Sequence, residues 1–212
     1  MVVAIDGPAG SGKSTVARVV AERAGFIYLN SGLFYRAITL SVLASRADPG
    51  SPPAVISAAR RADLRLANGK IALGEKEVES LLHTDAIDEW VAHHSAIPEV
   101  RDVVNQRLRQ AVRGLDAVVE GRDITTVVFP DAEIKIYLDA SIGVRAKRRH
   151  DQGVSTLSLS ELEKRIAERD KVDRNKPVGA LRISTAALYL DTSDLTIEQV
   201  CEKVLEKIRK TA

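Results

Sequence analysis

The chain has 212 residues, of which 45% are hydrophobic, and its 31 basic and 29 acidic side chains give a net charge of +2. A chain of this length buries roughly 70% of the surface that its unfolded form exposes, so we expect one main domain. The near balance of charge argues against a nucleic-acid partner, and no apolar run approaches the roughly 20 residues of a membrane span. Without a secretory leader pattern, and with Cys201 as the only cysteine, the sequence leads us to expect a cytoplasmic protein.

In the first half of the chain, short β-branched runs alternate with helical patterns. The expected elements are a strand over residues 2–6, a helix over 13–24, a strand over 27–29, and helices over 33–45 and near 54–61. Ser31 is a candidate N-cap of the helix over 33–45. Residues 64–73 alternate apolar and polar side chains around an Asn-Gly pair, which predicts a β-hairpin. We expect the region 64–81 to be a small antiparallel insert outside the main sheet.

The second half continues the alternation of strands and helices. The expected elements are helices over 86–94 and 98–113, strands over 117–119 and 134–138, helices over 141–150 and 160–173, a short strand over 187–190 and a helix over 196–210. Pro98 suits the first position of its helix. On the last helix, Cys201 falls within an apolar stripe, which predicts a core thiol. The whole pattern predicts an α/β fold, a parallel sheet between two layers of helices.

A glycine-rich loop lies between the first strand and the first helix. Gly7, Pro8, Ala9, Gly10, Ser11, Gly12, Lys13 and Ser14 match glycine, four residues, glycine, lysine, then serine or threonine. The backbone N–H groups of such a loop surround phosphate oxygens, and the following helix adds a favourable dipole. Lys13 can reach the β and γ phosphates, and the Ser14 hydroxyl is placed to bind the Mg²⁺ that bridges them. The sequence therefore predicts a P-loop NTPase core that binds ATP through residues 7–15, with Thr15 included.

The P-loop alone does not identify the reaction, because GTPases, motors and small-molecule kinases share it. Further along the chain, Arg36 falls about one turn into the helix after the second strand. Glu120, Gly121, Arg122 and Asp123 follow a buried strand, at the sheet edge where open α/β folds bind ligands. These charged residues are therefore candidates for the second half of the site.

A charged face follows the apolar face of the helix that begins near Ser160. The residues spaced three and four apart are Leu159, Leu162, Ile166, Arg169, Asp173 and Lys176. If the helix continues that far, they share one face, and the charged ones line a cleft. Alternatively, the helix ends near Asp170.

Three arginines lie on the preceding helix, Arg145, Arg148 and Arg149, and a glycine-bearing connection over 151–157 joins the two helices. This arrangement suits a mobile lid, since phosphoryl transfer needs positive charge around the transferring oxygens and exclusion of water.

Four stretches carry a resemblance to a known family: residues 5–14, 31–36, 121–124 with 126–132, and 169–170 with 173–175. With them, the sequence resembles bacterial cytidylate kinases over nearly its whole length. The resemblance implies one nucleoside monophosphate kinase over 1–212. Its core would span 1–36, 115–145 and 177–212, its monophosphate-binding region with the β-containing insert 37–114, and its helical lid 146–176.

The resemblance also implies roles for individual residues. Arg36 and Arg122 would hold the acceptor phosphate, and Arg101 and Asp123 would reach the cytosine, where a carboxylate accepts from the 4-amino group that uracil lacks. The implied CMP-binding set is Ser31, Tyr35, Arg36, Arg101, Gly121, Arg122, Asp123, Arg169, Asp173 and Lys176. The implied catalytic set is Lys13, Arg122, Arg149 and Arg169.

Four positions depart from the family pattern. Lys176 stands where arginine is frequent, which keeps the charge but loses the bidentate fork. Thr125 replaces a common glycine, Glu120 a frequent aspartate, and Ala92 lies about where a base-contacting serine can occur. Ala92 bears on how strongly cytosine is selected, and Thr125 bears on the stiffness and position of the loop after Asp123. Neither of these two positions touches the phosphate machinery.

We therefore expect ATP-dependent, Mg²⁺-assisted phosphorylation of CMP and dCMP, in pyrimidine nucleotide metabolism, by a monomer. The alternatives are a P-loop kinase for UMP or another small acceptor and, from another class, a nucleotide-dependent switch, for which no Asn-Lys-x-Asp motif is evident. We interpret His93 and His94 as polar side chains that face solvent rather than as metal ligands, and Trp90 as a packing residue.

Overall fold

The computed structural model describes residues 1–67, 70–153 and 157–211. They form two compact units, Met1–Tyr28 with Leu115–Ala212, and Leu29–Gly114. In the described residues, no helix is both long enough and apolar enough to span a bilayer.

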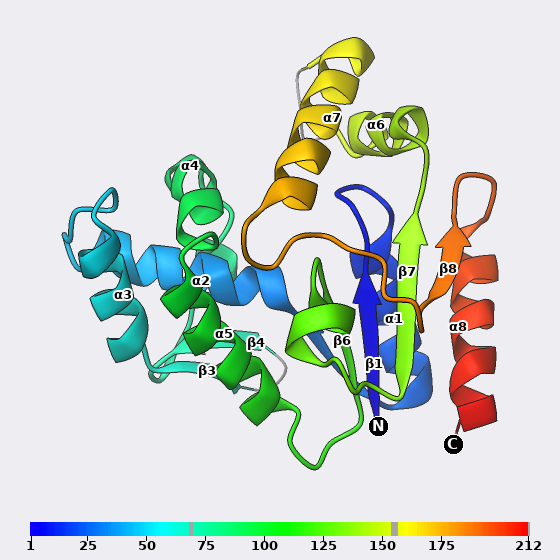
Figure 1. The fold of residues 1–212 in the computed structure, drawn as a ribbon, viewed down its shortest axis with the longest axis horizontal. Coiled ribbons are helices and arrows are strands. Elements are labelled where there is room, and N and C mark those ends of the chain that lie inside the picture. The colour runs from blue at the N-terminus through cyan, green and yellow to red at the C-terminus, as the bar shows by residue number, and fades with distance from the viewer. Residues whose placement is uncertain (68–69, 154–156, 212) are drawn as a thin grey trace. The chain divides into compact units, whose positions relative to one another are not determined.

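The first unit is built on a parallel sheet. Its elements are β1 (Val2–Asp6), α1 (Lys13–Ala24), β2 (Ile27–Asn30), β6 (Ala117–Gly121), the π-helical turn η2 (Ile124–Val128), β7 (Ile134–Asp139), α6 (Ile142–Asp151), α7 (Leu159–Asn175), β8 (Leu188–Asp191) and α8 (Ile197–Thr211). The division between the units falls within β2, after Tyr28. The strand order is β2-β6-β1-β7-β8, and β1 pairs in parallel with both β6 and β7. Parallel pairing brings the carboxyl ends of these strands to one edge, and α6 and α7 lie beyond that edge (Figure 1).

One face of this sheet is covered by α1 and α8 (Figure 1). The shared core is apolar, and its fully buried members include Val3, Ile5, Val20, Ile136 and Val204. Cys201 is buried in the same core, as its position on the apolar stripe predicted. The amphipathic pattern of α8 is therefore used to cover the sheet.

Helix α1 has the predicted bounds because its ends are coded locally. Its N-cap is Gly12 and its C-cap is Gly25, both in the left-handed conformation, and the Gly25 N–H reaches the carbonyls of Ala21 and Glu22. Glycine adopts this conformation without the strain that a side chain adds. The left-handed Gly12 thus allows the loop to lead directly into the first turn of α1.

The second unit contains α2 (Ser31–Ala44), α3 (Pro52–Arg61), β3 (Leu64–Ala67), β4 (Lys70–Leu73), β5 (Lys76–Glu77), the 3₁₀ turn η1 (Glu79–Leu81), α4 (Asp85–His94) and α5 (Pro98–Ala111). Its three short strands form a separate antiparallel sheet in the order β3-β4-β5. The predicted insert is confirmed as separate from the main sheet, while its Asn-Gly pair, residues 68–69, lies outside the described residues. Helix α2 packs against α3, α4, α5 and β4.

Two local predictions are wrong. The N-cap of α2 is Asn30 rather than Ser31, because the Asn30 side chain accepts a 2.8 Å hydrogen bond from the Gly32 N–H. His94 is buried and does not face solvent as predicted. Its Nδ1 lies 3.0 Å from Thr39 Oγ1 and its Nε2 lies 3.1 Å from the Pro49 carbonyl oxygen. Trp90 stacks on the His94 ring, in agreement with its predicted packing role.

Helix α7 continues to Asn175, which confirms the longer of the two alternatives. Its buried face was predicted only in part, because it runs through Leu162, Ile166, Asp170 and Asp173. Leu159 and Arg169 are exposed.

Candidate functional site

The phosphate loop connects β1 to α1 in a conformation that only glycine-rich sequence allows. Gly7, Gly10 and Gly12 have φ angles of 154°, 78° and 90°. A Cβ atom added at Gly7 would lie 2.0 Å from the Leu138 carbonyl oxygen of β7, and one at Gly10 would lie 3.1 Å from the Arg145 Cβ. Both positions are therefore closed to a side chain.

Side chains contact three carbonyl groups of this loop. Lys13 Nζ donates to the Pro8 carbonyl at 2.7 Å, and Arg145 Nη1 donates to the Ala9 carbonyl at 3.1 Å. Thr192 Oγ1 lies 3.3 Å from the Ser11 carbonyl oxygen and 2.9 Å from that of Asp139, so its single proton is shared between two acceptors. The first N–H groups of α1 have no acceptor within the helix, as at any helix N-terminus. Such N–H groups and the helix dipole together favour a bound anion.

Lys13 is buried, and its neighbours identify the residues that share its electrostatic environment. Burial, with a further contribution from the charges of Arg122 and Arg169, lowers the pKa of Lys13 to about 7. Glu120 and Asp6 oppose this shift. The structure thus brings the end of β6, the exposed arginine of α7 and the loop lysine into one charged region. A polyphosphate bound there would stabilise the ammonium form of Lys13.

The carboxylate of Asp173 connects β6 to the last turn of α7. It accepts from Arg122 Nε at 3.0 Å and from Lys176 Nζ at 2.9 Å. Burial raises the pKa of Asp173, but the positive charges of Arg122 and Lys176 outweigh it and hold this pKa below its usual value. Lys176 is the C-cap of α7 and reaches Asp173 from just beyond the helix.

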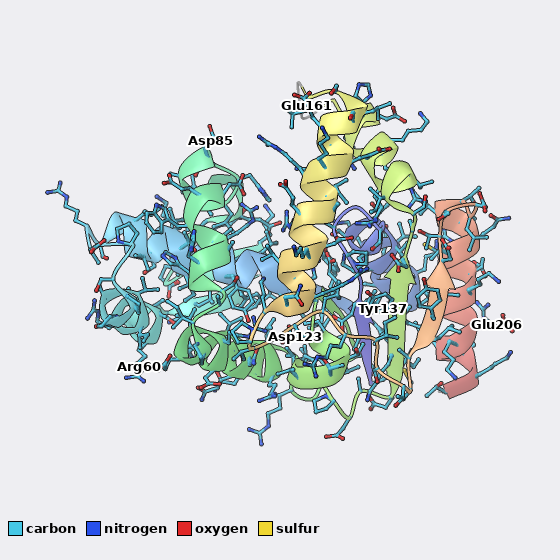
Figure 2. All side chains as sticks on the ribbon, turned by 45° about the horizontal axis from the view of Figure 1, so that its top comes forward. Arg60, Asp85, Asp123, Tyr137, Glu161 and Glu206 are labelled. Carbon is cyan, nitrogen blue, oxygen red and sulfur yellow. The ribbon has the colours of Figure 1, made fainter. Side chains whose placement is uncertain are left out.

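Asp123 follows Arg122 directly, and Figure 2 labels it. Its side chain is buried, and its backbone carbonyl accepts from the N–H groups of Val127 and Val128. The turn η2 begins one residue later, where the Asp6 carboxylate accepts from the N–H groups of Ile124 and Thr125. Asp6 therefore fixes the backbone immediately after Asp123.

The lid arginines differ in their surroundings. Arg145 is buried and bound to Asp170 of α7, with Nη2 2.7 Å from Oδ2. Arg148 donates to Thr192, and Arg149 is exposed. At the opposite end of α7 from Asn175, Glu161 completes a capping box with Ser158 (Figure 2). The predicted connection between the two helices falls partly on residues 154–156, outside the described residues.

The remaining predicted CMP-binding residues belong to the second unit. Within it, the Arg101 guanidinium lies over the Tyr35 ring, 5.5 Å from the centroid, and Nη1 donates to the Ser95 carbonyl. Arg36 donates to the Leu82 carbonyl at 2.8 Å and pairs with Asp88 at 2.5 Å. Ser31 is buried at the first position of α2. The second unit thus brings Tyr35 and Arg101 together.

Sequence reasoning missed two residues of this region, Asp170 and Thr192. Asp170 is adjacent to the predicted Arg169, and from Leu162 onward a stripe spaced four, four and three instead of four, three and four would have included it. Thr192 lies in no motif, and its 3.3 Å contact with the Ser11 carbonyl oxygen spans 181 positions of sequence.

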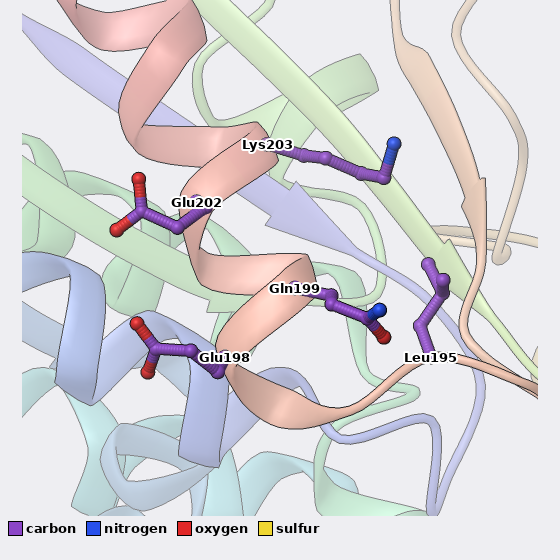
Figure 3. Close-up of a pocket in the computed structure, with 5 residues that line it drawn as sticks. All are labelled: Leu195, Glu198, Gln199, Glu202 and Lys203. Carbon is purple, nitrogen blue, oxygen red and sulfur yellow. The ribbon is translucent and has the colours of Figure 1, made fainter.

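A separate open hollow lies along α8, lined by Leu195, Glu198, Gln199, Glu202 and Lys203 (Figure 3). It contains none of the predicted site residues. Glu198 is already paired with Arg23 at 2.6 Å. Across the described part of the chain, no group of three or more His, Cys, Asp and Glu side chains is arranged to hold a metal ion. We therefore assign no site to this hollow.

The sequence is similar to known proteins over nearly its whole length. The chain is 41% identical over 212 residues to cytidylate kinase 1 of Borreliella afzelii, covering 98% of this chain and 96% of the relative. It is 39% identical over 211 residues to cytidylate kinase of Caldanaerobacter subterraneus, covering 98% and 94%.

Two solved structures with a similar fold are shikimate kinases. The one from Acinetobacter baumannii has 17% sequence identity and a TM-score of 0.51, and the match covers 99% of this chain and 93% of that chain. The one from Bacteroides thetaiotaomicron has 10% sequence identity and a TM-score of 0.53, and the match covers 99% of this chain and 98% of that chain. At these identities the likeness concerns the fold alone, and it confirms the predicted P-loop α/β/α architecture. The sequence model of the cytidylate kinase family matches residues 3–210. The chain belongs to the cytidylate kinase family.

Proposed function

We propose that the protein transfers the γ-phosphoryl group of ATP to CMP, and also to dCMP, in pyrimidine nucleotide metabolism. The observation that carries this proposal is the charged region around Lys13, to which Arg122 and Arg169 contribute from two other elements. Family membership supports ATP as donor and CMP as acceptor.

Donor binding would use residues 7–15 of the loop and of α1. Arg145 holds the Ala9 carbonyl, which directs the N–H of the same peptide to the opposite side, where it would serve a phosphate oxygen. Lys13 would leave the Pro8 carbonyl and bind the transferring phosphate. Catalysis then rests on positioning and charge neutralisation, because the attacking phosphate oxygen is already an anion.

Mg²⁺ would enter with ATP as part of the substrate. Ser14 is exposed in the first turn of α1, directly after Lys13, and its hydroxyl is the hard oxygen ligand that this ion accepts. The closed glycine positions leave the loop shaped for phosphate oxygens, so the residues present fit the Mg²⁺ complex of ATP. When bound, the ion neutralises charge between the β and γ phosphates.

Acceptor binding would use the ten residues that the family resemblance implies. In the first unit, Gly121, Arg122, Asp123, Arg169, Asp173 and Lys176 would contact the nucleotide. In the second unit, Ser31, Tyr35, Arg36 and Arg101 would do so. Asp123 and Arg101 would select cytosine over uracil by their opposite hydrogen-bonding characters. The exposed Arg149 and Arg169 would reach the phosphates as the lid, 146–176, closes over the core.

The direct test is ADP formation by the purified protein with Mg²⁺, ATP and each of CMP, dCMP, UMP, AMP and shikimate. We expect turnover with CMP and dCMP, weaker turnover with UMP, and only background with the other two. An inactive protein with CMP, or a faster reaction with another acceptor, would contradict the proposal. Lys13→Ala should lose nearly all turnover and keep its circular dichroism spectrum, and a variant that kept most activity would remove Lys13 from the mechanism. We further propose that the protein is a cytoplasmic monomer. Light scattering of the purified protein measures its molar mass and so tests the monomeric state.

A further inference from the structure

Arg145, beside the phosphate loop, donates four hydrogen bonds. It lies in the first turns of α6 with 2% exposure. Its Nε donates to the Ala140 carbonyl at 2.9 Å, and Nη1 donates to the Ala9 carbonyl at 3.1 Å. The two terminal nitrogens also reach the two oxygens of Asp170, at 3.1 and 2.7 Å. One guanidinium thus joins the end of β7, the phosphate loop and α7.

The bond to Ala9 bears on how the loop presents its N–H groups. A peptide group whose carbonyl is held on one side directs its N–H to the other side, because the peptide is planar. Arg145 therefore fixes the peptide that joins Ala9 to Gly10 with its oxygen towards α6. The 3.1 Å approach of a Gly10 Cβ to the Arg145 Cβ shows that α6 and the loop are packed together at this point.

The hydrogen bonds to Asp170 fix the position of α7 relative to Arg145. The apolar contact between α6 and α7 is small, with Ala146, Leu162 and Ile166 as its buried members. Asp170 continues this buried face one turn further, with side-chain exposure of 6% against 3% for Arg145. A buried ion pair is weak evidence for added stability, but a two-nitrogen, two-oxygen contact is specific in direction and register.

We propose that Arg145 and Asp170 are positioning residues that hold α7 in register with the phosphate loop. The neighbours of Asp170 on α7 are Arg169, whose charge acts on Lys13, and Asp173, which binds Arg122. Through this pair, the phosphate-accepting conformation of the loop is coupled to the positions of Arg169 and Asp173 on α7. The inference rests on the proposed function, to which it adds the link between donor binding and the lid.

Hydrogen–deuterium exchange of the full chain, with and without magnesium pyrophosphate, tests the link directly. Pyrophosphate should slow exchange in the loop and first turn of α1, and also in the second half of α7. In Asp170→Asn the loop protection should persist, while the protection of α7 should fall at least fivefold. The matched control is Asp151→Asn, which removes an exposed carboxylate paired with Lys147 on α6 and should behave as wild type.

Steady-state kinetics supply the second readout. Misplacement by about 1 Å can lower turnover roughly 100-fold, so kcat of Asp170→Asn should fall 10- to 100-fold. The KM for ATP should change less than threefold, since the loop itself is retained. Arg145→Lys keeps the charge pair but cannot serve Ala9, Ala140 and both Asp170 oxygens at once, so it should fall between Asp170→Asn and wild type.

The outcomes separate the two proposals. A pair that only stabilises the fold would lower the melting temperature of Asp170→Asn and leave the pyrophosphate protection of α7 intact, which would overturn the inference. If Asp170→Asn does not fold, wild-type kcat and α7 protection in Arg145→Lys would overturn it instead. Should wild-type protein leave CMP unphosphorylated while pyrophosphate still protects α7 through Asp170, the acceptor assignment fails and the positioning role stands. If pyrophosphate fails to protect α7 in wild-type protein, the inference is wrong.

Discussion

The hydroxyl of Thr125 donates a 2.6 Å hydrogen bond to the buried carboxylate of Asp6. Asp6 is the last residue of β1, before the phosphate loop, and Thr125 lies two residues after Asp123. The bond therefore ties the donor side of the proposed site to the turn that carries Asp123. The Thr125 hydroxyl thus has a defined partner in this chain.

Thr125→Val should destabilise the protein by about 1–3 kcal/mol, since a buried carboxylate loses one hydrogen bond. Burial raises the pKa of Asp6 from 3.8 to about 6, while the Thr125 hydrogen bonds lower it. A raised carboxyl pKa means that the stability contributed is fully present below about pH 4 and is lost as pH rises through 6. The variant should raise this pKa further, so its deficit in urea unfolding should be larger at pH 8 than at pH 5.

Thr126→Val is the matched control for this experiment. Thr126 Oγ1 is buried and, among the described residues, has no hydrogen-bond partner. Replacing that hydroxyl by a methyl group should be neutral or stabilising. Equal deficits in the two valine variants at both pH values would mean that the Asp6 contact contributes nothing.

Asp173→Asn tests the contact between Arg122 and α7. Removing the charge leaves two partly buried cations, Arg122 and Lys176, without their carboxylate, and should lower stability by about 1–3 kcal/mol. The KM for CMP should rise at least tenfold, because Arg122 loses its orientation. The exposed Glu168→Gln, on the same helix, should leave both quantities unchanged.

The pH dependence of the Asp173→Asn effect has a definite sign. Because the pKa of Asp173 is held below its usual value by Arg122 and Lys176, its contribution to stability is present above about pH 4. It is lost as pH falls through the lower, folded-state pKa. The difference in unfolding free energy between wild type and variant should therefore shrink towards pH 3, and a constant difference would argue against the charge interaction.

The phosphate loop was predictable because its chemistry is local. Strand, glycines, lysine and helix are contiguous, and each requirement is a property of the backbone. The buried face of α7 was harder to assign, since spacings of three and four are both compatible with one helix face. Asp170 rather than Arg169 is buried because Arg145 supplies a partner from another helix, and that pairing cannot be derived from the periodicity of α7.

The same reasoning explains why His94 was misassigned. An adjacent pair of histidines on a helix has no local feature that distinguishes a buried ring from an exposed one. The partner of its Nδ1, Thr39, is 55 positions away in the sequence. Contacts of this range require the packing of α2 against α4, which composition and periodicity do not specify.

Binding of the Mg²⁺ complex of ATP should take up a proton at pH 8. The pKa of Lys13 is lowered to about 7 by burial and by Arg122, so Lys13 is mostly neutral at pH 8 before the nucleotide binds. The triphosphate raises this pKa again, and affinity should fall as pH rises above 7. Calorimetry at pH 8 in two buffers of different ionisation enthalpy measures the uptake directly. Lys13→Arg, which stays charged, should bind without it, and equal uptake in both proteins would assign the proton to another group.

Gly7→Ala should abolish tight binding of ATP, whereas Gly25→Ala should not. Both glycines have positive φ, 154° and 70°, but an added Cβ at Gly7 would meet the Leu138 carbonyl at 2.0 Å, while at Gly25 nothing lies within 4 Å. Gly25→Ala should therefore lose only about 1–2 kcal/mol of stability, for the left-handed conformation. At Gly7 the backbone of the loop or of β7 has to move, and a shift of about 1 Å can reduce function roughly 100-fold. Titration of each variant with ATP and Mg²⁺ compares the two, and wild-type affinity in Gly7→Ala would show that the close approach to β7 does not shape the loop.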